Sequence, residues 1–408
     1  MKNVVLLLFL VPACLGAYDL GLIVDQNSGL GGTVSDDEPS VDYAATLIPR
    51  FSVFLGETNS WDIFISAGLT ADYENEEWTF LPELLRTEIS GRDGNFRIKF
   101  GRTPYADPLN FIVDGLFDGT QFLFDTTGGT LSLGAWYTGL LYKKKAYIIM
   151  NPEVTPEDFI SYYAPVDYEN FAHTYFASKR VLTALNWEHP SIAEVVRLKF
   201  AMIGQFDLND RDILYHSQYA SLKMSVLVKR FAFEWGGAFQ TAEAGKGFMD
   251  FNIGYAAELG ISWALPGAAH SLSLNGKYSS GKDESGLVAA FVPVTVKEQG
   301  NILKARFSGI SIINLDYTVR MHQTLSSGLT ASYFIRNDLG TYKGYPLSGM
   351  DSDGHFLGGE FFWRTIWSPI SDLRLNLGGS IFFPSMGDAA PNADYQWRVE
   401  MGVVLALY

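Results

Sequence analysis

The chain has very little cysteine and comparatively little charge. Cys14 is the only cysteine in a sequence of 408 residues, so neither a disulfide nor a cysteine-based metal site can be built. Charged residues make up 18% of the chain, whereas ordinary soluble domains have about 25%. The net charge of −15 argues against a general nucleic-acid-binding role.

Long apolar runs are also scarce, apart from the N-terminal leader. Lys2, the apolar run 4–11 and the small residues up to Ala17 are typical of a secretory signal peptide, residues 1–17. An alternative is lipidation of Cys14, although Pro12 fits a lipobox poorly. Beyond the leader there is no uninterrupted apolar run of the ~18 residues that a membrane helix needs. Hydropathy averages do not detect barrel strands, in which apolar and polar residues alternate.

Sequence signals of catalysis are missing as well. None of the six histidines stands at a close metal-ligand spacing from another. We find no nucleophile elbow, phosphate-binding loop or dinucleotide fingerprint. We therefore expect no enzyme activity, no cofactor and no metal site.

What the sequence does contain is a repeated period of two. Between Met249 and Trp263, for example, large apolar side chains alternate with small or polar ones. Several such segments run ten residues or more, which is the length that crosses a bilayer at a tilt, whereas strands of a sandwich have about 5–6 residues. Aromatic residues such as Trp61 and Trp397 stand at the ends of the apolar faces, as in the aromatic girdles of membrane barrels.

The alternation predicts about 18 strands, with 16 as the alternative. The predicted strands cover residues 18–26, 42–55, 61–73, 81–90, 96–103, 118–126, 130–143, 173–188, 194–206, 214–229, 231–242, 248–264, 270–280, 303–321, 328–338, 354–368, 373–384 and 394–408. Short connections follow the even-numbered strands, and most long ones follow the odd-numbered strands. Short periplasmic turns and longer outer loops give this pattern in outer-membrane barrels.

The last residues of the chain point to the same class. The stretch "WRVEMGVVLALY" resembles the closing strand of bacterial outer-membrane β-barrel proteins, which carries an insertion signal for the barrel-assembly machinery. The residues that match this signal are Glu400, Gly402, Leu405, Leu407 and Tyr408. The resemblance implies an all-β fold in which residues 18–408 form one antiparallel transmembrane barrel, exported to the bacterial outer membrane with both termini in the periplasm. The implied partners are outer-membrane lipid, the assembly machinery and small solutes, with a homotrimer as a possibility.

Charged residues on the polar faces of the strands are the candidate pore lining. The basic candidates are Arg86, Arg97, Lys99, Arg197, Lys199, Lys223, Lys304, Arg306, Arg320, Arg364, Arg374 and Arg398. The acidic candidates are Asp62, Asp72, Glu88, Glu234, Asp250, Glu258, Asp316, Glu360 and Glu400. They either create a transverse field that orders polar solutes or pair with one another and only solvate the lumen.

Two apolar connections, residues 105–119 and 146–171, are candidates for narrowing such a lumen. Residues 105–119 are too apolar for a solvated loop, and we expect them either to fold inward or to pack on the outer rim. Residues 146–171 are long and aromatic, which suits a lid, a plug or a hydrophobic path. Residues 287–296 suit an extension of a strand above the membrane.

A barrel of about 18 strands is wide enough for an aqueous channel. The sequence therefore favours a porin-like passive channel for small polar or charged solutes. Two alternatives remain open at this stage: a transporter of hydrophobic compounds that resembles the long-chain fatty-acid transporters, and a surface adhesin.

Overall fold

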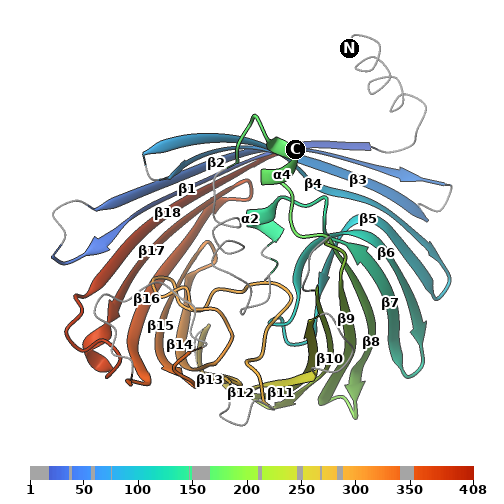
Figure 1. Cartoon of the computed structure of the whole chain (residues 1–408). Coiled ribbons are helices and arrows are strands. Elements are labelled where there is room, and N and C mark those ends of the chain that lie inside the picture. The colour runs from blue at the N-terminus through green and yellow to red at the C-terminus, as the bar shows by residue number, and fades with distance from the viewer. Residues whose placement is uncertain are drawn as a thin grey trace.

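The structure is a computed structural model that describes residues 18–35, 39–56, 60–74, 76–146, 148, 166–209, 214–245, 251–266, 269–282, 288–340 and 353–408. These residues form a barrel of 18 antiparallel strands (Figure 1). Each strand pairs with its neighbours in the chain, and β1 pairs with both β2 and β18, which closes the ring. The predicted leader, residues 1–17, lies outside the described residues.

The strands are long throughout the wall. Their bounds are β1 (Tyr18–Thr33), β2 (Ser40–Leu55), β3 (Trp61–Glu74), β4 (Glu77–Asp93), β5 (Phe96–Ala106), β6 (Asp114–Thr126), β7 (Gly129–Tyr137), β8 (Arg180–Ile192), β9 (Val196–Asp207), β10 (Leu214–Val228), β11 (Phe231–Gly245), β12 (Phe251–Ala264), β13 (His270–Ser279), β14 (Ile310–His322), β15 (Leu325–Arg336), β16 (Phe356–Ile370), β17 (Leu373–Phe383) and β18 (Gln396–Leu407). Every predicted strand corresponds to one of these, so the prediction of an 18-stranded antiparallel barrel is confirmed. The largest errors at a strand end are seven residues: the predicted strands 173–188 and 303–321 begin before Arg180 and Ile310, and the predicted strand 18–26 ends before Thr33.

The two faces of the wall differ as the alternation predicts. Large apolar side chains are exposed on one face, among them Leu69, Phe100, Met202, Leu259 and Met401. The register places these residues beside other outward-facing apolar residues, and the polar residues between them face the lumen. A strand edge with unpaired backbone groups is costly in lipid, which explains why the ring is closed. The continuous apolar outer surface suits the same hydrocarbon surroundings.

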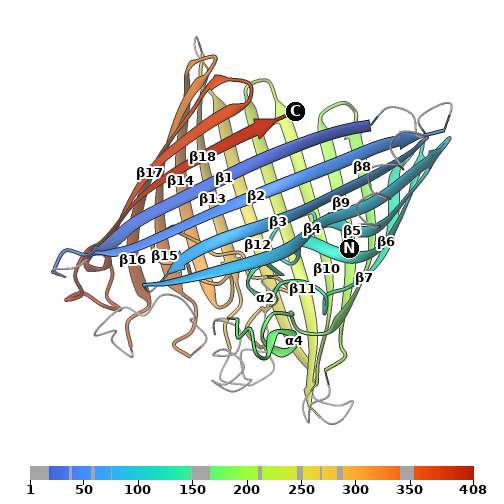
Figure 2. The same cartoon turned by 90° about the horizontal axis from the view of Figure 1, so that it is seen from above.

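The connections differ in length at the two ends of the barrel. Short turns such as 94–95, 127–128 and 371–372 join the strands at one end, here named the turn end, where the chain also ends. The connections 138–179, 280–309 and 337–355 leave from the other end, here named the loop end. Figure 2 shows the strong tilt of β1 to β4 and the loops gathered at one end. No helix in the described part of the chain is long and apolar enough to cross a membrane.

The wall has a wedge between β4 and β5 toward the loop end. Their pairing ends at Thr87↔Arg102, although β4 continues to Glu77 and β5 to Ala106. Side chains cap the bare backbone edge of β4: the Tyr168 hydroxyl bonds with the Phe80 N–H (3.0 Å) and carbonyl (2.9 Å), the Tyr175 hydroxyl with the Pro82 carbonyl (2.8 Å), and the Arg102 guanidinium with the Leu84 carbonyl. Tyr168 and Tyr175 belong to the connection that carries the short helices α2 (Lys143–Ala146) and α4 (Phe171–Thr174), so this connection covers the bare edge of β4.

Candidate functional site: the narrowed lumen

The connection between β5 and β6, residues 107–113, folds into the lumen and is held by one carboxylate. The Asp107 carboxylate accepts backbone hydrogen bonds from Leu109 (2.8 Å), Ile112 (2.9 Å) and Val113 (3.0 Å). Burial raises the pKa of Asp107 to about 6. The three backbone hydrogen bonds favour the charged carboxylate and lower the pKa, but their effect is smaller than that of burial. Phe111, Ile112 and Val113 of this segment, here named the first inward segment, are buried in the apolar cluster that fills this part of the barrel.

The first inward segment reaches the far wall of the barrel. Gly236 lies on the inward face of β11, and a Cβ atom there would lie 2.3 Å from Leu109 Cδ2. Glycine at this position therefore gives the segment the space to cross from β5 to β11. The prediction that part of 105–119 folds inward agrees with this placement, although residues 105–106 and 114–119 belong to β5 and β6.

A second inward segment, residues 288–308, packs on the first. The N–H groups of Val294 (2.7 Å) and Thr295 (3.2 Å) both donate to the Ile112 carbonyl. Phe291 and Phe307 lie against Phe111, with ring centroids 6.1 and 4.7 Å away. The interpretation of 287–296 as a strand extension is therefore wrong for its described residues, because they fold into the lumen and bury their apolar side chains there.

Glu360 of β16 holds the second inward segment against the wall. Its carboxylate accepts the N–H groups of Asn301 (2.5 Å), Ile302 (3.1 Å) and Leu303 (3.1 Å). Glu360 is only 2% exposed. We predicted Glu360 as a water-exposed pore-lining acid; it lies on the inward face, but the segment that it anchors covers it.

Most of the predicted charged residues occupy inward-facing register positions of the wall. Their strand neighbours place them there: Asp62, Asp72, Arg86, Glu88, Arg97, Lys99, Arg197, Lys199, Lys223, Glu234, Glu258, Asp316, Arg320, Glu360, Arg364, Arg374, Arg398 and Glu400. Lys304 and Arg306 were placed on a wall strand, which is wrong, because both belong to the second inward segment. Asp250 lies outside the described residues.

The inward charges are extensively paired. The wall pairs are Arg97 with Asp125 (2.8 Å), Lys99 with Glu88 (3.3 Å), Arg86 with Glu88, Lys199 with Glu188 (3.0 Å), Lys223 with Glu234 (3.1 Å) and Glu258 (3.0 Å), and Arg398 with Asp42 (2.8 Å) and Glu400 (2.6 Å). Within the described chain, Arg197, Arg320, Arg364 and Arg374 make no ion pair. Most of the predicted basic residues are therefore neutralised by a neighbouring acid, and these four arginines are the predicted wall cations that keep their charge for a solute.

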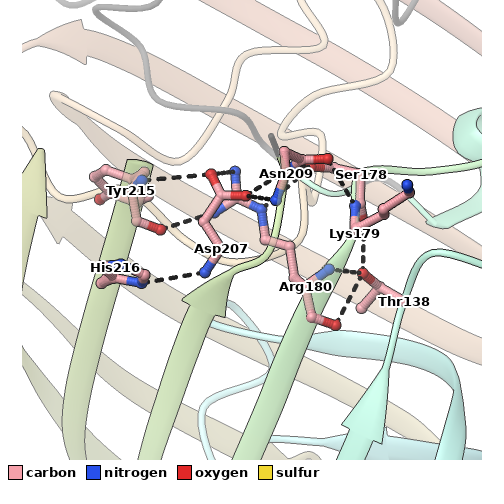
Figure 3. Close-up of polar contacts among 8 residues, drawn as sticks. All are labelled: Thr138, Ser178, Lys179, Arg180, Asp207, Asn209, Tyr215 and His216. Atoms are coloured by element: carbon pink, nitrogen blue, oxygen red, sulfur yellow. Dashed lines mark hydrogen bonds and ion pairs between the residues drawn. The ribbon is translucent and has the colours of Figure 1, made fainter. Parts of the chain in front are cut away.

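Two buried ion pairs near the loop end were not singled out from the sequence. Arg180 and Asp207 are 1% and 5% exposed, and their side chains lie 3.5 Å apart. Arg180 also donates to the Tyr215 carbonyl at 3.1 Å, so the pair joins β8, β9 and β10 (Figure 3). Arg102 binds Asp118 through two hydrogen bonds of 2.9 and 2.8 Å beside the wedge. Arg180 begins β8 and Asp207 ends β9, whereas Arg102 and Asp118 lie within β5 and β6. Because the partners stand 27 and 16 residues apart in the chain, the sequence gives little signal for either pair.

The residues of the predicted insertion signal lie on the closing strand. Glu400 and Gly402 face inward, whereas Leu405 and Leu407 face outward beside Val24 and Leu22 of β1. Tyr408 follows the strand, and the Arg50 guanidinium lies 4.3 Å from the centre of its ring.

Comparisons with known proteins identify the fold. No family model matches the chain, and no curated protein matches it. Among solved structures, Pseudomonas aeruginosa OccK2 (OpdF) in complex with glucuronate matches with a TM-score of 0.59 and 13% identity over 96% of this chain and 97% of that chain. The outer membrane protein OpdK of the same organism gives a TM-score of 0.60 and 13% identity over 96% and 99%. The outer membrane protein OprD gives 0.58 and 14% over 96% and 93%. The chain therefore has the barrel fold of these outer membrane proteins.

Proposed function

We propose that this protein is a passive diffusion channel for small polar or charged solutes across the bacterial outer membrane. The observation that carries the proposal is the lumen itself: polar and ion-paired side chains line its wall, and two inward segments reduce its cross-section. Such a lumen passes small polar solutes and excludes large ones, because the segments limit the cross-section and the wall replaces part of the solute's hydration. The glucuronate bound to the similar barrel OccK2 supports a small polar solute.

Planar-bilayer recording of the refolded protein in KCl tests this function. We expect stable, discrete open steps, because the two inward segments leave a fixed passage rather than a fluctuating one. A bilayer that stays silent under applied voltage would contradict the proposal.

Wall charges are proposed to set the ion preference of the channel. Arg97 and Lys99 face the lumen and pair with Asp125 and Glu88. Arg97→Glu with Lys99→Glu removes the cation of Asp125 and one of the two cations of Glu88 and adds two negative charges, so we expect a shift of the reversal potential toward cations. The matched variant, Arg97→Gln with Lys99→Gln, should shift it less. Equal reversal potentials in all three proteins would remove the wall charges from selectivity.

The C-terminal residues are proposed to guide assembly. Deletion of Tyr408 should reduce the rate of folding into outer-membrane-lipid vesicles that contain the assembly machinery. Arg50→Ala is the control, because it removes only the cation beside the Tyr408 ring and leaves the C-terminal signal intact. A homotrimer stays a proposal that chemical cross-linking in detergent tests.

A further inference from the structure

Each inward segment has a pocket beside it. The first pocket, of about 320 Å³, lies between the first inward segment and the inward faces of β6 to β9. The second, of about 290 Å³, lies between the second inward segment and β14 to β16. In the ring these two groups of strands stand far apart, with β10 to β13 between them on one side and β17, β18 and β1 to β5 on the other.

Uncharged amides and hydroxyls line the first pocket. Gln121 and Asn110 present side-chain amides that have no hydrogen-bond partner within the described chain. Asn186 is held in place, because its amide donates to the Ser132 hydroxyl at 3.1 Å and its carbonyl oxygen accepts from Tyr105 at 2.9 Å. Amides offer both donors and acceptors, so the pocket can bind a group that needs both.

The charged residues of the first pocket are already neutralised. Lys199 and Glu188 pair with each other at 3.0 Å. The Asp107 carboxylate accepts its three backbone N–H groups and is 2% exposed. A solute that enters this pocket therefore meets no charge without a partner.

The second pocket has the same character. Asn314 and Ser332 line it, and their side chains have no hydrogen-bond partner within the described chain. The Asn301 amide is bound to the Ser380 hydroxyl. The carboxylate in the lining of this pocket belongs to Glu360, and it accepts hydrogen bonds from three backbone N–H groups of the second inward segment. In each pocket the buried carboxylate, Asp107 or Glu360, is bonded to the backbone of the inward segment, so the groups available to a ligand are neutral and polar.

We propose that these two pockets are binding subsites for uncharged polyhydroxylated solutes of about the size of a monosaccharide. The proposal rests on the channel function above and adds the solute class. Each hydroxyl of such a solute both donates and accepts, which matches amide and hydroxyl linings, and pockets near 300 Å³ are at the small end of ligand sites. A carboxylate solute would need a free cation, and the lining of the two pockets contains one cation, Lys199, which pairs with Glu188.

Single-channel recording with glucose and with gluconate tests the subsites. Wild-type protein in KCl should show glucose-dependent current interruptions, with weaker or absent interruptions from gluconate at the same concentration. Gln121→Leu and Asn314→Leu should each shorten the glucose residence time about fivefold, as expected for the loss of one neutral hydrogen bond.

The matched control is Gln218→Leu, the same kind of change on the outward face of β10. It should leave the glucose interruptions unchanged. KCl conductance of each variant reports that the channel is folded and open. Open channels in which gluconate, but not glucose, interrupts the current would overturn the subsites and leave the channel function standing. So would equal effects of Gln121→Leu and Gln218→Leu. A silent wild-type bilayer would overturn both proposals.

Discussion

The two inward segments are both fixed by a buried carboxylate that accepts three backbone N–H groups, but the two carboxylates come from different places. Asp107 belongs to the segment that it holds, and its partners are two, five and six residues away. Glu360 belongs to the wall, and its partners are 57 to 59 residues away. The first anchor therefore shapes its segment, whereas the second ties its segment to the barrel.

The contrast implies different consequences when each anchor is lost. Without Asp107 the first segment loses its shape, but its apolar contacts with the second segment still hold it inside. Without Glu360 residues 301–303 of the second segment lose three hydrogen bonds to β16, although the bonds of Asn301 to Ser380 and of Val292 to Gln240 remain, and the first segment loses part of the fixed surface on which it packs. Changes at Glu360 should therefore widen the passage more than changes at Asp107.

Glu360→Ala is expected to have the largest effect. Hydrogen bonds to charged acceptors contribute about 1.5–3 kcal/mol each, so docking of the second segment should weaken by on the order of 3–5 kcal/mol. Single-channel conductance should rise, and limited proteolysis should cut within residues 299–305. Glu234→Ala, a change of the same kind at a more exposed wall acid, is the control that should do neither. Protection of 299–305 in Glu360→Ala would refute the anchor.

Asp107→Asn should have a smaller effect. An amide has one acceptor oxygen, so its NH₂ group must face at least one backbone N–H, which costs about 1–3 kcal/mol. Open-channel noise should increase while the mean conductance changes little. A conductance increase as large as that of Glu360→Ala would show that the two anchors do not differ in the way proposed.

Acid pH should stabilise the first segment through Asp107. Its pKa in the folded segment is about 6, above the ordinary 3.8, chiefly because of burial. A raised pKa of an acid gives stability that is complete below about pH 3.8 and is lost as the pH rises through about 6. Open-channel noise should therefore rise between pH 4 and pH 7 in the wild type, and this step should be missing in Asp107→Asn. The same step in both proteins would assign it to other carboxylates.

Thr295→Val is expected to have the smallest effect. The Thr295 hydroxyl accepts from the Asp114 N–H at 2.9 Å and so links the second inward segment to the first residue of β6, next to the end of the first segment. Its loss should cost about 1 kcal/mol. Combination with Asp107→Asn in a double-mutant cycle should give a non-additive change in noise, since both changes act on the same junction. Strict additivity would separate the junction from the anchor.

The sequence predicted the wall well and the inward segments poorly, for the same reason. Period two marks any strand that separates lipid from water, and this rule found all 18 strands. Leu303, Ala305 and Phe307 also alternate with polar residues, so they were assigned to a strand. They are buried inside the barrel instead, against the first segment. Alternation records that one face is apolar but not whether lipid or protein covers it.

The roles of single charged residues were the least predictable. The register put 18 predicted residues on the inward face, because side-chain direction follows from strand position. Pairing was harder to predict, since Glu88 meets Lys99 of the neighbouring strand only once β4 and β5 are in register. Glu360 accepts hydrogen bonds from a segment of the connection between β13 and β14, which folds back to the wall. No local sequence pattern predicts such a contact.

The central claim is that folded segments inside an open barrel set the width of a passive channel. Single-channel conductance of the wild type and of Glu360→Ala, recorded in the same lipid and salt, tests this claim most directly. The account predicts discrete steps in both proteins and a larger step in Glu360→Ala. Silence in both proteins, or steps of equal size, would contradict it.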